Sequence, residues 1–172
     1  MKIQELNRSV MDTPYGEMVA MATAKGLCVL EFVKPKRQEL LTRRLNKWFS
    51  GYTISDISGP ILEQTGQWLD DYFKREFERL SAPPLDLRGT GFELRVWHAL
   101  LRIPLGETAS YGQVAMELGI PKAARAVGGA NRRNPVSLIV PCHRVIGRND
   151  SLVGYGGGLD VKKALLMHER KM

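Results

Sequence analysis

Cysteine and histidine are scarce in this chain of 172 residues, which holds two cysteines, Cys28 and Cys142, and three histidines. Two cysteines cannot form a disulfide framework, and neither of them has a Cys-x-x-Cys partner. Because the histidines are scattered as well, the sequence argues against a structural zinc site. We therefore expect two reduced thiols and no bound metal.

Long apolar runs are also missing. No segment approaches the roughly 18 uninterrupted apolar residues that a membrane helix requires. The first residues, MKIQELNRSV, are polar and lack the apolar block of a signal peptide. We therefore expect a cytoplasmic protein that does not associate with membranes. Hydrophobic residues make up 44% of the chain, enough to fill one large core or two small ones.

Positive charge is concentrated in the second half of the chain. Residues 1–90 contain 13 Lys and Arg against 12 Asp and Glu, whereas residues 91–172 contain 12 against 6. Such an excess is expected if the second half binds a polyanion, although an ordinary basic surface would give the same count. Charge alone leaves both interpretations open.

A break between two domains is visible in residues 81–92, SAPPLDLRGTGF. The Pro83-Pro84 pair and two glycines cannot continue a helix and suit an extended linker. We therefore predict an N-terminal domain over residues 1–88 and a C-terminal domain over residues 89–172.

The N-terminal domain is predicted to be a small α/β unit. Apolar residues alternate and then run together on either side of Lys25-Gly26, which predicts a strand hairpin. Residues 59–77 carry apolar side chains at roughly helical spacing. Cys28 lies in the apolar run and is interpreted as a core residue. No group of residues in this half indicates chemistry.

The C-terminal domain contains a predicted helix-turn-helix. Ser110 is a candidate N-cap for a helix over residues 111–118, which Gly119 ends. Pro121 then starts a second helix over residues 122–131. Two short helices joined by a three-residue turn with a glycine form this motif.

The second of these helices is unusual because its side chains are small. They are Ala123, Ala124, Ala126, Gly128, Gly129 and Ala130. Each glycine costs a helix roughly 1 kcal/mol relative to alanine, so close approach to another surface is a plausible reason for them. The DNA minor groove, about 6 Å wide, is one such surface, and Arg125 could enter the base stack from this face. Tight packing against the core, with Arg125 in solvent, is the alternative.

A candidate reactive thiol follows an apolar segment in residues 134–147, NPVSLIVPCHRVIG. Residues 136–140 are nearly all apolar and predict a buried strand, which Pro141 ends. Cys142 then lies at the end of a rigid element, where a nearby basic group would favour its thiolate. In an extended strand His143 would point to the opposite face, so a direct pair needs a bend or a water between them. On this stretch alone the signal is modest, and because buried cysteines are common, a structural cysteine is the favoured interpretation.

The C-terminal segment offers a possible third member of the site. Helical projection of LDVKKALLMHERK puts four residues on one side: Val161, Ala164, Leu165 and His168. Glu169 falls inside the apolar sector, so it is either a boundary residue that reaches solvent or a buried carboxylate that orients a histidine. The GYGGG segment, residues 154–158, is either a set of accessible backbone amides or a flexible turn.

Together these motifs resemble a known family. SYGQVA, ARAVGGANRRNP, PCHRVIG and GYGGGLDVKKALLMHE stand in the order and spacing of the methylated-DNA–protein-cysteine methyltransferases, the O6-alkylguanine-DNA alkyltransferases. The resemblance covers residues 90–170 and is specific, whereas the first half carries no diagnostic motif. It implies an α/β fold class: a ribonuclease-H-like N-terminal domain, followed by a mainly helical, winged-helix-like domain for DNA binding and catalysis.

The resemblance assigns roles to residues that match its motifs. The catalytic set is Cys142, His143, Glu169, Asn134 and Tyr111. The pocket for the substrate base is assigned to Val145, Tyr155 and Gly156. The DNA-binding set is Tyr111, Gly112, Arg125, Gly128 and Arg148.

Within these sets, the resemblance makes Cys142 the alkyl acceptor and His143 the base that takes its proton through water. Glu169 would orient that histidine, and Tyr111 would crowd the target phosphate and donate to the leaving guanine. Arg125 would fill the space of the extruded nucleotide, in agreement with the role suggested by its helix.

The implied reaction is DNA repair by direct reversal. The partner is double-stranded DNA with alkylated bases, bound in the minor groove with the target nucleotide flipped out of the stack. The alkyl group of O6-alkylguanine, and also of O4-alkylthymine, moves to Cys142, and the resulting thioether inactivates the protein. We expect a monomer in solution, and no metal, nucleotide or other cofactor.

Three other functions are considered. A lesion-binding protein without transfer activity would share the fold, but it would lack the acceptor cysteine. A transcriptional regulator would need polar base-reading side chains on the second helix, which is almost bare. A thiol hydrolase would turn over an ester or peptide substrate.

Overall fold

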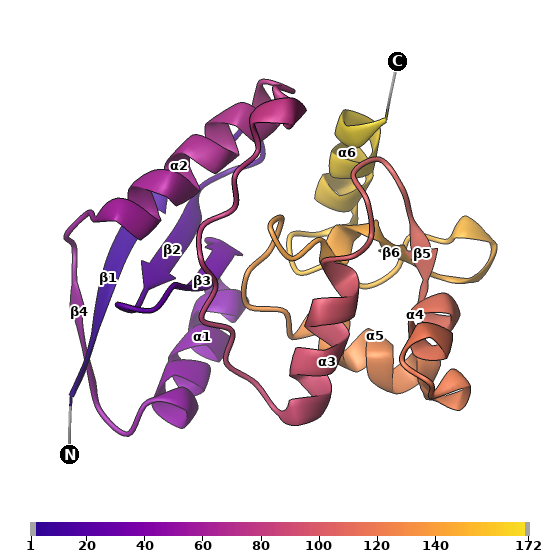
Figure 1. Cartoon of the computed structure of the whole chain (residues 1–172), viewed down its shortest axis with the longest axis horizontal. Helices are drawn as coiled ribbons and strands as arrows, with labels where there is room; N and C mark the ends of the chain where they lie inside the picture. The colour runs from indigo at the N-terminus through magenta and orange to yellow at the C-terminus, as the bar shows by residue number, and fades with distance from the viewer. Residues whose placement is uncertain (1–2, 171–172) are drawn as a thin grey trace. The chain divides into compact units, whose positions relative to one another are not determined.

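The chain divides into two compact units, one ending at Arg88 and the other beginning at Gly89. The structure is a computed structural model that describes residues 3–170, and Figure 1 traces the chain through both units. The longest helices of this part of the chain have 14 residues, and none of its helices could span a membrane.

The first unit is built on a four-stranded sheet. Its elements are β1 (Gln4–Met11), β2 (Met18–Ala22), β3 (Leu27–Phe32), α1 (Pro35–Trp48), β4 (Tyr52–Ser55), α2 (Pro60–Phe73) and the 3-10 turn η1 (Phe77–Arg79). The strand order is β3-β2-β1-β4, with β1 and β4 parallel and the other neighbours antiparallel. The hairpin predicted around Lys25-Gly26 is confirmed as β2 and β3, and the helix predicted within residues 59–77 is confirmed as α2.

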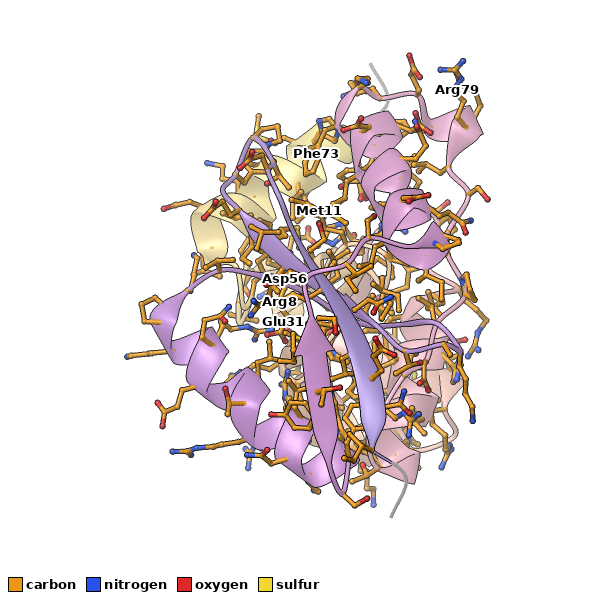
Figure 2. The ribbon with its side chains drawn as sticks, turned by 90° about the vertical axis from the view of Figure 1, so that its left-hand side faces the viewer. Arg8, Met11, Glu31, Asp56, Phe73 and Arg79 are labelled. Atoms are coloured by element: carbon orange, nitrogen blue, oxygen red, sulfur yellow. The ribbon has the colours of Figure 1, made fainter. Side chains whose placement is uncertain are left out.

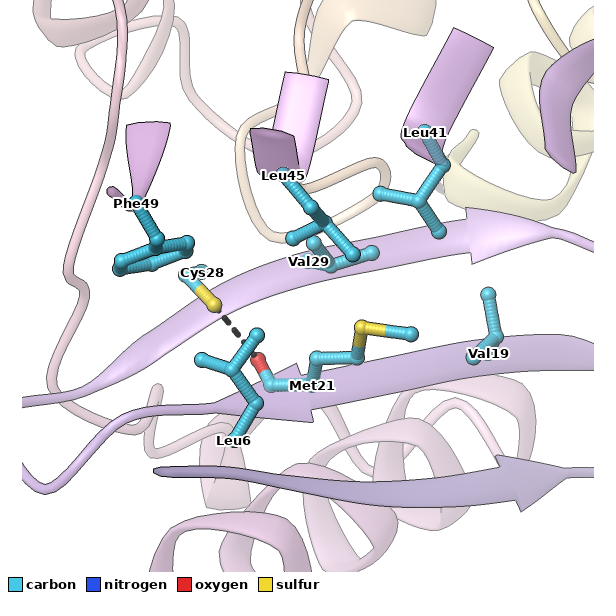
Figure 3. Packing of buried hydrophobic residues seen from close by; sticks show 8 residues of the cluster. All are labelled: Leu6, Val19, Met21, Cys28, Val29, Leu41, Leu45 and Phe49. Carbon is cyan, nitrogen blue, oxygen red and sulfur yellow. Dashed lines mark hydrogen bonds between the residues drawn. The ribbon is translucent and has the colours of Figure 1, made fainter. Parts of the chain in front are cut away.

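The core of this unit explains why its central strands are almost entirely apolar. Every residue of β2 and β3 is buried, because helices cover the sheet. Leu41 and Leu45 of α1 pack with Cys28 and other strand residues in one cluster, while α2 contacts the first three strands. Figure 3 shows the Cys28 thiol inside this cluster, donating to the Met21 carbonyl at 3.3 Å. The prediction that Cys28 is a core residue is confirmed.

Ion pairs border the sheet of the first unit. Arg8, on β1, and Asp56, just after β4, continue the parallel register of their strands, and Nε of Arg8 lies 2.7 Å from a carboxylate oxygen of Asp56. Both residues are labelled in Figure 2. This pair is exposed and contributes little stability. Glu31 is buried, and one of its oxygens accepts from Arg37 at 2.6 Å and from Arg44 at 2.7 Å. These bonds compensate a carboxylate that would otherwise be costly to bury.

The second unit is mainly helical. Its elements are α3 (Gly91–Leu100), β5 (Ala109–Ser110), α4 (Tyr111–Glu117), the 3-10 turn η2 (Pro121–Ala123), α5 (Ala124–Arg132), the 3-10 turn η3 (Cys142–Arg144), β6 (Val145–Ile146), the 3-10 turn η4 (Arg148–Asp150) and α6 (Leu159–Glu169).

The predicted helix-turn-helix corresponds to α4, η2 and α5. Ser110 caps α4 and forms a reciprocal capping box with Gln113, as the N-cap prediction requires. Gly119 ends the helix with φ of 74°, a conformation that favours glycine. Pro121 begins a 3-10 turn, so the second helix starts at Ala124, two residues later than predicted.

Small residues allow α5 to pack closely on α3. The indole N–H of Trp97, on α3, donates to the carbonyl of Ala130 at 2.9 Å. Such a side-chain bond to a helix carbonyl requires an unobstructed approach, which the methyl group of alanine permits. On another side of α5, a Cβ on Gly128 would touch the ring of Tyr111 at 3.6 Å. The small side chain of Ala130 therefore serves packing within the unit, whereas Ala126 is exposed.

Candidate active site

A compact turn before Cys142 is held by the side chain of Asn134. Its oxygen accepts from the N–H of Val136 at 3.0 Å, and its amide donates to the carbonyl of Val140 at 2.8 Å. The N–H of Val140 also binds the carbonyl of Val136. Because these bonds use the groups that a strand would offer to a neighbour, the strand predicted from Val136 to Val140 is wrong.

Cys142 begins the 3-10 turn η3 and is only 5% exposed. Its N–H donates to the carbonyl of Val140, and its own carbonyl accepts from the amide of Asn131. Successive residues of a 3-10 turn are rotated by about 120°, so His143 does not point to the opposite face as in a strand. The turn thereby supplies the bend that a cysteine–histidine pair needs. Neither cysteine of the chain is in a disulfide.

His143 and Glu169 form a buried pair. The Nε2 atom of His143 lies 2.7 Å from a carboxylate oxygen of Glu169, and the two side chains are fully buried. Arg144 donates to both oxygens of the same carboxylate, at 2.8 Å and 3.0 Å, and also to the carbonyl of Ile103. Of the two readings of Glu169, the structure supports the buried carboxylate that orients a histidine.

The electrostatics of this pair fix its protonation. Burial opposes ionisation of Glu169, but hydrogen bonds and charges from His143 and Arg144 outweigh it and hold the pKa of Glu169 well below its usual range. Burial lowers the pKa of His143, although Glu169 acts in the opposite direction. At neutral pH the site therefore combines a carboxylate with a neutral imidazole.

The neutral imidazole has only one suitable tautomer. An ionised carboxylate can only accept hydrogen bonds, so the proton of His143 is on Nε2, where it is donated to Glu169. Nδ1 then carries a lone pair, and it makes no hydrogen bond to any residue between 3 and 170. The arrangement leaves His143 able to accept a proton at Nδ1.

Tyr111 lies close enough to Cys142 for the charge of the thiol to affect its pKa. In the parallel pair of β5 and β6, Ser110 lies opposite Ile146, so α4 begins at the C-terminal end of β6, whereas η3 leads into the other end of that strand. The hydroxyl of Tyr111 donates to the carbonyl of Val153 at 3.3 Å. Burial and then the charge of Cys142 raise the pKa of Tyr111. This hydroxyl is consequently protonated at neutral pH and can act as a donor.

Residues predicted to bind DNA gather around one cleft of about 400 Å³. The cleft is lined by Ser110, Tyr111, Gly112, Pro121, Ala124, Arg125 and Arg148. Arg125 and Arg148 are exposed, whereas Gly128 lies behind the cleft against Tyr111. Four of the five predicted residues therefore share one concave, positively charged surface.

The residues predicted to line the base pocket differ in their exposure. Tyr155 is half-buried, and its ring lies edge-on to His143 with centroids 6.3 Å apart. Gly156 follows it and is also half-buried. The side chain of Val145 is fully buried, and its backbone carbonyl accepts from Lys162 at 2.5 Å.

One residue of the site was missed by the sequence analysis. Lys162, on α6, is fully buried and donates to the carbonyls of Val145 and Val153 at 2.5 Å and 2.8 Å. The buried face of α6 consists of Lys162, Leu165 and Glu169, spaced i, i+3 and i+7. The predicted face with His168 was therefore rotated, and the shared spacing of Lys162 and Glu169 was the signal that could have corrected it.

The sequence matches two family models that together span most of the chain. The first is described as "6-O-methylguanine DNA methyltransferase, ribonuclease-like domain" and covers residues 6–87. The second is described as "6-O-methylguanine DNA methyltransferase, DNA binding domain" and covers residues 91–171. Each match falls within one of the two compact units.

Individual proteins are similar over nearly the full length. A methylated-DNA–protein-cysteine methyltransferase of Mycobacterium leprae is 44% identical over 93% of this chain and 90% of its own length. One from Methanosarcina acetivorans is 38% identical over 94% and 96%. A crystal structure of Mycobacterium tuberculosis OGT in complex with DNA superposes with a TM-score of 0.78 and 40% identity, covering 96% of this chain and 92% of that one. The chain thus belongs to the 6-O-methylguanine DNA methyltransferase family.

Proposed function

We propose that this chain repairs alkylated DNA by moving the alkyl group of O6-alkylguanine onto Sγ of Cys142 in a single turnover. The observation that carries the proposal is the neutral, buried His143, whose Nε2–H is held by Glu169 while Nδ1 remains able to accept. Such a base, next in sequence to a thiol, is suited to generate a thiolate. The names of the similar proteins support the same reaction.

The first step is loss of the thiol proton. His143 accepts it at Nδ1, directly or through one water molecule, and becomes an imidazolium. Glu169 stabilises that positive charge and keeps the ring in place. Asn134 acts as a positioning residue, because its hydrogen bonds shape the turn that ends at Cys142.

The second step is a displacement at the alkyl carbon. The thiolate sulfur forms a bond to this carbon as the bond between the carbon and O6 breaks, and the electron pair goes to guanine. Tyr111 donates a proton to a ring nitrogen, so guanine leaves uncharged, and the proton held by His143 then passes through solvent to the Tyr111 phenolate. The product is a thioether. Nothing in this reaction cleaves it, so each molecule acts once, without metal, nucleotide or reductant.

The proposed substrate is double-stranded DNA, and the solved relative is in complex with DNA. Extrusion of the target nucleotide costs a few kcal/mol. Arg125 is exposed at the edge of the cleft beside Tyr111 and can occupy the place of the extruded base. We propose that α5 enters the minor groove, that a monomer suffices, and that O4-alkylthymine is a second substrate.

The test is a mass measurement with limiting substrate. The chain is mixed with less than one equivalent of duplex DNA carrying one O6-methylguanine, and intact and peptide masses are recorded. We expect one added methyl group, on the peptide with Cys142, in an amount equal to the lesion supplied. Excess lesion should add no second methyl group.

The other outcomes identify the alternatives. Tight binding of the duplex without a change in mass would make the chain a lesion-binding protein. Catalytic turnover of an ester with an unchanged lesion would indicate a thiol hydrolase. Preference for one unmodified DNA sequence would point to a regulator, and any of these results would overturn the proposal.

A further inference from the structure

We propose that Lys162 is a positioning residue for the alkyl transfer, because its ammonium group joins the turn that carries Cys142 to the loop that holds Tyr111. The inference rests on the proposed function and assigns a role to a residue outside the predicted site. Its basis is geometric: one buried nitrogen donates to two backbone carbonyls, those of Val145 and Val153, that belong to different segments of the unit.

The first carbonyl belongs to the thiol-bearing turn. Val145 closes η3, and its N–H donates to the carbonyl of Cys142. A bond of 2.5 Å from Lys162 to the carbonyl of Val145 therefore fixes the end of the turn that presents the thiol. Since the side chain of Val145 is fully buried, its peptide group has little freedom to rotate.

The second carbonyl is shared with Tyr111. The carbonyl of Val153 accepts from Lys162 at 2.8 Å and from the hydroxyl of Tyr111 at 3.3 Å. A carbonyl oxygen has two lone pairs, so it can accept both bonds. Loss of the lysine donor would release this loop, and with it the position of the tyrosine hydroxyl.

A buried lysine without such a role would be hard to explain. Lys162 is fully buried, and burial lowers the pKa of Lys162 to about 8, with only the charge of Cys142 acting the other way. Buried lysines are rare because removing an ammonium group from water is costly. The two carbonyl bonds compensate this cost.

The main test compares Lys162→Met with Lys163→Met. Methionine retains the length of the lysine stem but neither donor nor charge, whereas Lys163 is exposed on the same helix and controls for the lost charge. We expect Lys162→Met to lower the transfer rate at saturating duplex by at least about tenfold, since small displacements in a site have effects of this size. The affinity for duplex should change by less than about twofold, because phosphate contacts determine it. Lys163→Met should transfer at the wild-type rate.

A double-mutant cycle with Tyr111→Phe separates positioning from general stabilisation. If Lys162 acts through the carbonyl that it shares with Tyr111, the rate penalty of Lys162→Met should be at least about threefold smaller in the Tyr111→Phe background. Equal penalties in both backgrounds, or a wild-type rate in Lys162→Met, would overturn the inference.

Two further measurements keep the result interpretable. If Lys162→Met does not fold, Lys162→Gln replaces it. The amide is shorter and can reach only one carbonyl, so we expect an intermediate rate, and a wild-type rate would contradict the proposal. The wild-type chain is measured first with O6-methylguanine duplex. Failure to methylate Cys142 would remove the proposed function itself, whereas normal wild-type transfer with an equally fast Lys162→Met would remove only the role of Lys162.

Discussion

Each unit of this molecule buries one cysteine and one glutamate, yet only in the second unit is the glutamate bonded to a histidine. In the first unit, burial raises the pKa of the Cys28 thiol to about 12, and the thiol donates to a core carbonyl. Glu31 accepts from two arginines, and burial still raises its pKa. In the second unit, His143 lies next to Cys142 and binds Glu169.

The difference is the histidine that binds the buried carboxylate of the second unit. All three histidines of the chain lie beyond residue 90, so the first unit has none. A buried thiol without a proton acceptor stays protonated and behaves as a small hydrophobic side chain. Burial of a cysteine is therefore not informative by itself, and the partner that can take its proton decides its chemistry.

The largest expected effect is the difference in methyl transfer between variants of the two cysteines. Cys142→Ser should show no detectable methyl transfer, because a serine hydroxyl beside His143 is a far weaker nucleophile than a thiolate. Cys28→Ala should transfer at the wild-type rate and lose only about 1 kcal/mol of stability. Intact mass after reaction with excess methylated duplex measures both, and melting curves verify folding. Methyl transfer by the serine variant would refute the assignment of Cys142.

Substitution of the two glutamates should give transfer rates that differ nearly as clearly. Glu169→Gln removes the negative charge that stabilises the His143 imidazolium, and we expect the transfer rate to fall by about 10²-fold. Glu31→Gln, measured below its melting temperature, should transfer at the wild-type rate because it changes only the core of the first unit. Single-turnover mass kinetics give both rates. Equal losses in the two variants would mean that stability, and not the base, limits transfer.

Arg125→Ala should slow transfer from duplex DNA but not transfer from the free base. If Arg125 replaces the extruded base, its loss should slow transfer from duplex DNA by about tenfold while leaving reaction with free O6-methylguanine unchanged. Lys122→Ala removes an exposed charge from the neighbouring turn η2 and serves as the control. Equal losses with both substrates would contradict the proposed role of Arg125.

Local signals in the sequence predicted much of the second unit. Ser110 and Gly119 delimit α4 because caps depend on nearby backbone groups. The strand predicted from Val136 to Val140 was wrong because Asn134, a polar side chain outside the apolar run, takes the backbone bonds. The apolar content of a segment indicates its burial, but it does not reveal which groups make hydrogen bonds with its backbone.

Tertiary contacts account for what the sequence could not reveal. Lys162 was missed because a helical lysine is normally solvated, and only its two carbonyl acceptors, both outside α6, make burial possible. Glu169 could be read in two ways for the same reason, since the partners that hold it, His143 and Arg144, lie 25 residues or more away in sequence.

The smallest expected effect concerns acid stability, and its sign differs between the buried glutamates of the two units. The pKa of Glu169 in the folded state is below its ordinary value of 4.5, so its stabilising contribution is present above that pH and is lost on acidification. The pKa of His143 is below its ordinary value of 6.5, so the unfolded chain takes up this proton first and stability falls below pH 6.5. Glu31 has a raised pKa, so its burial becomes less costly as the pH falls.

Acidification from pH 7 to pH 5 should therefore weaken the second unit more than the first. Hydrogen exchange, corrected for its intrinsic pH dependence, can follow residues 134–146 and residues 18–32 separately, and we expect protection to fall only in the former. His98→Gln, at an exposed histidine of α3, should leave this profile unchanged, whereas His143→Gln should flatten it. An equal loss of protection in both segments would show that the buried histidine does not distinguish the two units, and that their different use of cysteine has another cause.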